Sequence, residues 1–190
     1  MNTKILLAFL LILFIGCKKN ENSLILGKNE KSEVFVPKYG KLFFDYDEIN
    51  YYSIDISEED AMKLDSLSSF SKQNKLKSNL ISDDFPEKLS DINFENQLVD
   101  LGFKKKKISN SDFGNINKIF VEKTFQDGVD YACIPVYRDI LIFKKRKRII
   151  GFSKICFNCN QYHMIGSNGN TDNFGYDNDY ENLGKILDKY

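Results

Sequence analysis

The sequence has little of what most catalytic signatures require. It contains no tryptophan and a single histidine, His163, so a Ser-His-Asp hydrolase would have to use that residue, and no G-x-S-x-G motif accompanies it. It also lacks a P-loop, a glycine-rich dinucleotide motif and an H-E-x-x-H zinc motif. The motifs therefore predict no catalytic residue and favour a non-enzymatic protein, although an enzyme built on scattered carboxylates would leave no such signature.

Net charge is absent as well. The 190 residues carry 27 lysines and arginines against 27 aspartates and glutamates. Such a chain has no overall positive field to collect nucleic acid, so nucleic acid is not an expected partner. Apolar residues make up 42% of the chain, which suits one ordinary domain whose core does not depend on disulfides. With sixteen phenylalanines and ten tyrosines, the core is expected to be filled largely by aromatic rings.

The N-terminus has the pattern of a secretory signal. Lys4 precedes an apolar run at residues 5–15, which is too short to span a bilayer of about 30 Å as a stable helix. The run LFIGC that ends at Cys17 resembles the bacterial lipobox, in which the cysteine is acylated and becomes the new N-terminus. The alternative is an ordinary signal peptide followed by an unrelated cysteine.

The lipobox resemblance implies a domain plan and a location. Residues 1–16 are the signal peptide, and residues 17–32 are the lipidated Cys17 and a polar, flexible tether. Residues 33–190 form a single domain. Acyl chains on Cys17 would hold the protein to a membrane of the bacterial cell envelope, at the outer membrane, the cell surface or the periplasmic side.

The apolar patterning predicts an α+β fold: an antiparallel sheet with a long C-terminal hairpin and three to four helices. Strands are expected at residues 33–36, 41–46, 51–56, 131–143 and 148–157. Helices are expected from residue 58, at 86–101 with Gly102 as its left-handed end, at 111–123, and after a loop at 166–179. Residues 68–84 are predicted to be a helix end and a polar loop, and Lys104 to Lys107 a solvated segment, with a polyanion site as the alternative.

The hairpin brings the cysteines together. A turn near Arg146 and Lys147 makes paired residue numbers sum to about 293, so Ile142 faces Gly151 and Cys133 approaches the pair Cys156 and Cys159. In an exported protein this arrangement favours a disulfide, either between Cys133 and one member of the pair or within the pair.

Three other states of the cysteines are open. Cys133, Cys156 and Cys159 could bind a structural zinc ion with His163, since C-x-x-C followed by histidine suits tetrahedral coordination. The C-x-x-C pair could instead carry out thiol–disulfide exchange, although it follows a strand and not a helix N-terminus. The cysteines could also be buried and reduced. No other cofactor is expected.

Two polar segments have alternative interpretations. The basic run from Lys144 to Arg148 is read as a solvated hairpin tip, with contact to membrane or lipopolysaccharide phosphates as the alternative. Asn168, Asn170 and Asp172 alternate as calcium ligands can, but the loop departs from the calcium-binding pattern, so a turn-forming loop is expected.

The residues around the cysteines also resemble a recurrent pattern. Cys133, the YRD triplet at residues 137–139, Phe143 and the ICFxC run that ends at Cys159 are similar to an arrangement in exported proteins of Bacteroidetes-type bacteria. The resemblance covers residues 131–166 and implies no particular activity.

Taken together, the sequence predicts a membrane-anchored envelope lipoprotein that acts as a binding or interaction module. Its expected partner, besides the membrane, is an envelope protein, either in assembly or as a toxin that an immunity-type protein neutralises. The alternative is a thiol, disulfide or structural zinc protein centred on Cys133, Cys156 and Cys159.

Overall fold

The computed structural model describes residues 39–67, 71–124 and 133–190. The signal peptide, Cys17, the tether and the strand expected at residues 33–36 lie outside these ranges and stay predictions. Within the described ranges no helix combines the length and the hydropathy needed to cross a membrane.

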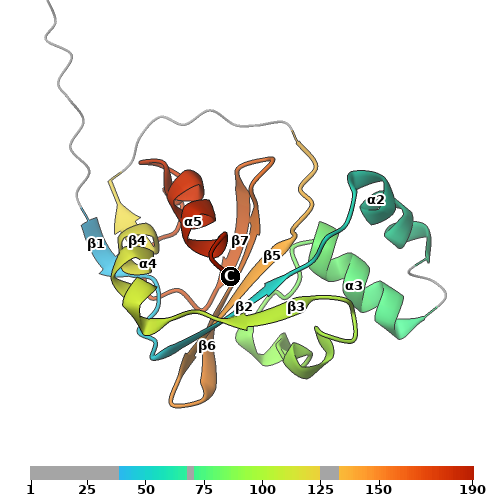
Figure 1. Ribbon diagram of the computed structural model, residues 1–190, viewed down its shortest axis with the longest axis horizontal. Coiled ribbons are helices and arrows are strands. Elements are labelled where there is room, and N and C mark those ends of the chain that lie inside the picture. Colours follow the sequence, from blue (N-terminus) through green and yellow to red (C-terminus); the bar gives the residue numbers. More distant parts are fainter. Residues whose placement is uncertain (1–38, 68–70, 125–132) are drawn as a thin grey trace, which may run out of the picture. The chain divides into compact units, whose positions relative to one another are not determined.

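The α+β prediction is confirmed (Figure 1). One antiparallel sheet pairs two strands, β1 with β4, and a second has five strands in the order β3-β2-β5-β6-β7, each pair antiparallel. The strands are β1 (Tyr39–Leu42), β2 (Glu48–Ser53), β3 (Lys104–Lys107), β4 (Val121–Lys123), β5 (Asp139–Lys145), β6 (Arg148–Cys156) and β7 (Gln161–Ile165). The helices are α2 (Glu58–Leu67), α3 (Lys72–Ser82), α4 (Phe113–Ile119) and α5 (Asp179–Leu187), with 3-10 turns η2 (Leu89–Asp91), η3 (Glu95–Gln97) and η4 (Asn110–Asp112).

Strand β5 lies in the middle of the five-stranded sheet and is packed on both faces. Leu141 and Phe143 belong to a first core, which also contains side chains of α4 and α5. Ile140 and Ile142 belong to a second core, which contains side chains of α2 and α3. All four have no exposed surface. Because successive side chains of a strand point to opposite faces, a strand covered on both sides requires the continuous apolar run found here.

Aromatic rings fill the first core, as the composition predicts. Phe44 stacks on Phe143 with ring centroids 4.2 Å apart, and Phe120 meets Phe143 edge-on at 5.1 Å. Phe174 extends the cluster from the loop before α5. Such pairs add about 0.5–1.5 kcal/mol each beyond the area they bury.

The hairpin between β5 and β6 closes where the sequence predicts. Arg146 and Lys147 form a two-residue turn with φ angles of 49° and 65°. Positive φ at both positions matches the right-handed twist of the flanking strands. Lys145 and Arg148 pair directly beside the turn.

Further along the hairpin, the predicted pairing is wrong by one residue. Phe143, not Ile142, faces Gly151, because the register shifts between Phe143 and Lys144. The shift is a β-bulge in which β6 has one more residue, Ile150, than the strand opposite. Ile150 therefore packs against the first core.

Gly151 follows the bulge, and the ring of Phe44 occupies the space where a Cβ would be. We expect Gly151→Ala to lower the free energy of unfolding by roughly 1–3 kcal/mol, because the added methyl overlaps that ring. Gly114→Ala in α4 is the matched control, since its new Cβ would have no atom within 4 Å. Alanine is the better helix former by about 0.8–1.0 kcal/mol, so the control should gain stability. Urea denaturation measures both, and equal losses would contradict the proposed contact.

The prediction of a helix end and a polar loop at residues 68–84 is wrong, because this segment contains α3. The Ser71 hydroxyl accepts a hydrogen bond from the backbone N–H of Asn74 at 3.0 Å and caps the helix. Leu80 and Ile81 are fully buried in the second core. The sequence signal is weak because the helix is mostly polar, and its stability comes from this short buried part.

The prediction of a helix at residues 86–101 is also wrong, because this segment forms the turns η2 and η3. The Asp91 carboxylate accepts a hydrogen bond from the backbone N–H of Lys88 at 3.2 Å. Local side-chain bonds of this kind compete with the α-helical ladder.

The end of that segment is as predicted. Gly102 has a φ of 98°, and the N–H of Phe103 donates to the carbonyl of Leu98 at 3.0 Å. Both apolar side chains lie in the second core. The left-handed terminator and its hydrophobic contact are therefore present without the helix.

Other element bounds also differ. The helix expected at residues 111–123 ends at Ile119 and continues into β4, and the strand expected at 41–46 stops at Leu42. The first strand of the hairpin begins at Asp139 and not at residue 131, while β7 was not predicted. The terminal helix is confirmed as α5, with Leu183 and Leu187 buried.

The four lysines expected in a solvated segment are solvent-exposed, but they form the edge strand β3. They pair with Asn50 to Ser53 of β2. Lysine is well suited to an edge strand because its charge opposes pairing with further strands.

Candidate functional site

The cysteines meet at the end of the β6–β7 hairpin, as the sequence predicts. Cys133 and Cys159 form a disulfide with a Cα–Cα distance of 5.7 Å, within the usual range. Cys133 is exposed, whereas Cys159 is 5% exposed. Of the disulfide alternatives open from sequence, the structure has the one that joins Cys133 to the C-x-x-C pair.

Cys156 is the free cysteine of this cluster. It ends β6, where it pairs in register with Gln161, and is 2% exposed. Its side chain packs with Tyr137 and Cys159 in a small separate cluster. The Gln161 amide donates to the carbonyl of Cys133 at 2.9 Å, so the hairpin also holds the segment before β5 by a hydrogen bond.

His163 lies on β7, opposite Lys154. Its Nε2 is 2.7 Å from the carbonyl oxygen of Pro86, and its Nδ1 is 3.9 Å from Asp84. Burial lowers the pKa of this imidazole, and the Pro86 hydrogen bond opposes the change.

The zinc site predicted from sequence needs three thiolates. In the disulfide-bonded form, Cys133 and Cys159 cannot act as thiolate ligands. The described ranges hold no group of three His, Cys, Asp or Glu side chains placed to bind a metal ion. A zinc site therefore stays a prediction for the reduced chain.

Lys154 is a buried lysine that the sequence reasoning missed. Its side chain has no exposed surface, donates to the backbone carbonyls of Asn79 and Asp83, and lies 4.4 Å from the centroid of the Tyr137 ring. These carbonyls belong to the C-terminal end of α3, where a cation is favoured. The signal available in the sequence was that Lys154 lies on the same face of β6 as Phe152, and that face is buried.

Burial lowers the pKa of Lys154 from 10.5 to about 7. The unfolded chain therefore keeps a proton that the folded chain loses between about pH 7 and 10.5, so stability rises with pH in that window. We expect the free energy of unfolding to increase by roughly 1 kcal/mol per pH unit from pH 7 to 9 because of this residue. Urea denaturation of Lys154→Met should show a flatter profile, while Lys106→Met on β3 keeps the wild-type slope. Identical slopes in Lys154→Met and wild type would contradict the assignment.

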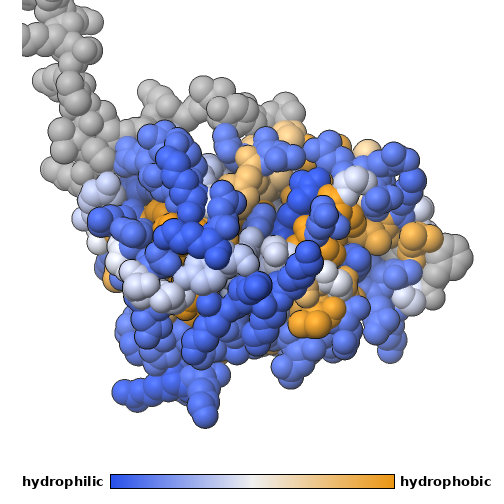
Figure 2. All heavy atoms as spheres, viewed as in Figure 1, coloured by the Kyte–Doolittle hydropathy of each residue, from blue (hydrophilic) through white to orange (hydrophobic). Residues whose placement is uncertain are grey.

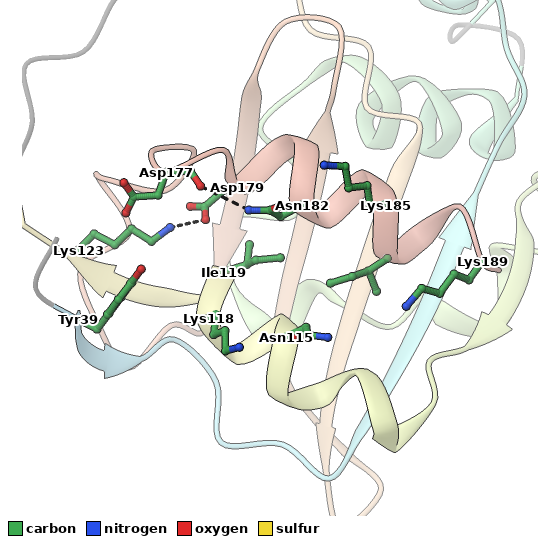
Figure 3. A pocket seen from close by; sticks show the side chains of 11 residues that line it. Tyr39, Asn115, Lys118, Ile119, Lys123, Asp177, Asp179, Asn182, Lys185 and Lys189 are labelled. Atoms are coloured by element: carbon green, nitrogen blue, oxygen red, sulfur yellow. Dashed lines mark hydrogen bonds and ion pairs between the residues drawn. The ribbon is translucent and has the colours of Figure 1, made fainter. Parts of the chain in front are cut away.

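A groove of about 450 Å³ lies between α4 and α5. In Figure 3, side chains reach it from both helices, with Ile119 of α4 toward its centre. Four lysines line it and outnumber its acidic residues, so we call it the basic groove. These lysines are Lys118, Lys123, Lys185 and Lys189. Its volume falls within the range of ligand-binding pockets.

One end of the basic groove is built on a buried ion pair. The Lys123 ammonium contacts the Asp179 carboxylate, and each side chain has 3% or less of its surface exposed. Lys123 also donates to the carbonyl of Tyr176 at 3.2 Å, and Asp179 accepts from the N–H of Gly175 at 3.0 Å. Burial raises the pKa of Asp179, and the bond from Lys123 opposes that rise. Removing either partner would leave the other charge buried and unpaired, which is strongly destabilising.

Asp177 lies beside the pair. Its φ angle is 58° and that of Asn178 is 61°, a conformation that brings the chain sharply into α5. One carboxylate oxygen of Asp177, Oδ2, is buried and has no hydrogen-bond partner within the described ranges. The amide of Asn182 donates to the Asp177 backbone carbonyl at 3.4 Å, the second contact drawn in Figure 3.

The remaining lysines differ in their partners. Lys185 pairs with Glu181, and both of these side chains are more than half exposed. An exposed pair of this kind contributes about 0–1 kcal/mol and exchanges readily with a ligand. Lys189 is 55% exposed but pairs with Asp112, whose side chain is only 12% exposed. Lys118 is exposed and has no ion-pair partner in the described part of the chain.

A second cleft, of about 620 Å³, lies on another side of α5 and has acidic character. Its deepest acid is Asp139, which accepts a hydrogen bond from the Tyr51 hydroxyl at 2.6 Å. Burial raises the pKa of Asp139, which the Tyr51 bond opposes and the Asp188 charge reinforces. A carboxyl group of this kind can exchange a proton, and in the described part of the chain its side-chain hydrogen bond is the one from the Tyr51 hydroxyl.

The basic hairpin tip is partly neutralised. Lys144 pairs with Glu95 at 2.7 Å, and Lys145 pairs with Asp45 at 2.8 Å. Burial disfavours the Glu95 charge, yet hydrogen bonds from Lys144, Asn50 and Tyr52 outweigh it and lower the Glu95 pKa. The interpretation as a solvated turn fits this arrangement better than a phosphate site.

In the loop before α5, the Asn170 side chain accepts from the N–H of Asp172 at 2.7 Å, as in a local turn. The loop expected from sequence therefore has the bonding of a turn. Figure 2 shows that the viewed face is mainly hydrophilic, with hydrophobic areas scattered between hydrophilic ones.

No family model, curated protein or solved structure matches this chain. Over the residues that the structure describes, the fold and site define a small α+β domain with a disulfide and two charged clefts beside α5.

Proposed function

We propose that this protein is a lipid-anchored binding module of the bacterial cell envelope, and that the basic groove holds a segment of an envelope protein. The anchor rests on the lipobox that ends at Cys17. The binding role rests on the groove, where Lys118 and the Asp177 oxygen are left without partners in the described chain. The Asp177 oxygen is buried, and a buried oxygen without a partner favours a ligand that donates to it, while the exposed Lys118 ammonium is available to pair with an acidic group.

The side chains that line the basic groove indicate which groups the bound segment of the partner would carry. A carboxylate of the partner would pair with Lys118, and a hydrogen-bond donor would reach Asp177. The apolar side chains of Ile119 and Ile186 between them suit a short aliphatic side chain. A binding role in envelope assembly or in neutralising a toxin would use the same contacts.

The anchor has a direct test. We expect the full-length protein to incorporate radiolabelled palmitate in its bacterial host, and Cys17→Ala to lose the label, because the thiol is the acylation site. Cys156→Ala is the matched control and should retain it. Unchanged labelling of Cys17→Ala would remove the anchor from the proposal.

The groove is tested by crosslinking in intact cells. A photoreactive residue in place of Asn182 should capture a defined envelope protein. Lys118→Glu should lower the yield about tenfold or more, since a charged hydrogen bond contributes about 1.5–3 kcal/mol. Lys106→Glu, which makes the same charge change on β3, should leave the yield unchanged. Equal yields for both variants would contradict binding in the groove, whatever protein is captured.

A further inference from the structure

The buried thiol of Cys156 has no part in the proposed binding function, and its position suggests a reaction. It belongs to one small buried cluster with Cys159, which forms the disulfide with Cys133. The three cysteines therefore include one thiol and one disulfide in a single cluster. Thiol–disulfide exchange needs just these two groups in contact.

The local backbone suits a bond between Cys156 and Cys159. Cys156 is the last residue of β6, and Cys159 lies in the turn of residues 157–160 that leads into β7. Residues three apart across a turn have Cα atoms within about 7 Å, which overlaps the range that a disulfide accepts. A Cys156–Cys159 bond therefore requires no change in strand pairing.

We propose that this protein carries out an internal disulfide exchange that makes Cys133 a reactive surface thiol. The Cys156 thiolate attacks Sγ of Cys159, the Cys156–Cys159 bond forms, and the Cys133–Cys159 bond breaks. Cys133 leaves as a thiolate and takes up a proton equivalent to the one that Cys156 lost. The number of disulfides is unchanged, so the step needs no oxidant or reductant.

Exposure gives the exchange its direction. Cys133 is exposed, whereas Cys159 is 5% exposed, so the thiolate released at Cys133 is hydrated. Lys154 lies two residues before Cys156 on the same face of β6, with its amino group over the ring of Tyr137, which belongs to the same buried cluster as Cys156. A basic nitrogen is thus present on the side of the sheet where the thiol loses its proton.

The released Cys133 is a modification site. It can attack an external disulfide, forming a mixed disulfide at Cys133 and releasing one thiol of that disulfide. The chemical class of partner is therefore a disulfide, either a small molecule or a protein. This reaction is independent of the basic groove, so each can fail without the other.

The first test maps the reaction in the acylated full-length protein. Incubation at pH 8 with oxidised glutathione should give a mixed disulfide at Cys133 together with a Cys156–Cys159 bond. Chymotrypsin cleaves after Phe157, so mass spectrometry can distinguish the two disulfides. In Cys156→Ser the Cys133 adduct should form at least tenfold more slowly. An adduct on Cys156 alone, or equal rates in both proteins, would overturn the proposal.

A second variant keeps the proposal testable if Cys156→Ser folds poorly. Cys133→Ser leaves Cys156 and Cys159, which should form a disulfide when the protein is made in an oxidising compartment. Alkylation followed by mass spectrometry should then find no free thiol at either position. Two alkylated thiols in a folded protein, judged by its near-UV circular dichroism, would show that the bond does not form and would reject the exchange.

Discussion

The two-sided burial of β5 is the constraint on which the other elements depend. The strand is hydrogen-bonded to β2 on one edge and to β6 on the other, and its central side chains have no exposed surface. Each face must therefore be covered, one by α4 and α5 and the other by α2 and α3. The basic groove is the space left between the two helices that cover the first core.

The second core is joined to the sheet by polar contacts as well as by apolar packing. Lys154 reaches from β6 to the end of α3, and His163 reaches from β7 to the carbonyl oxygen of Pro86. The disulfide adds a covalent link between the segment before β5 and the β6–β7 turn. The bond joins residues 26 apart in the sequence, and closing a loop of that length stabilises the fold by roughly 3.5 kcal/mol in the chain-entropy account. The cysteine cluster thus lies at a structural junction, which is why an exchange there would alter the attachment of the segment before β5.

The sequence predicted those parts of the fold that depend on local pattern. Strand alternation, the hairpin turn at Arg146 and Lys147, the Gly102 terminator and the approach of Cys133 to the C-x-x-C pair all follow from neighbouring residues. Helix α3 was missed because two buried side chains, Leu80 and Ile81, stabilise an otherwise polar segment. The bulge at Ile150 was missed because a one-residue insertion has no local signature. The basic groove assembles residues from α4, α5 and β4, so no single stretch of sequence could show it.

The lysine edge of the sheet has a consequence for pairing between copies of this protein. If two β3 strands paired in antiparallel fashion, the four lysines of one copy would face the four of the other. Like charges directly opposite on adjacent strands are destabilising. The proposed lipid anchor would give the protein a high local concentration at a membrane surface, where strand-to-strand association is otherwise favoured. This edge would keep neighbouring copies apart at low ionic strength and do so less effectively as added salt screens the charges.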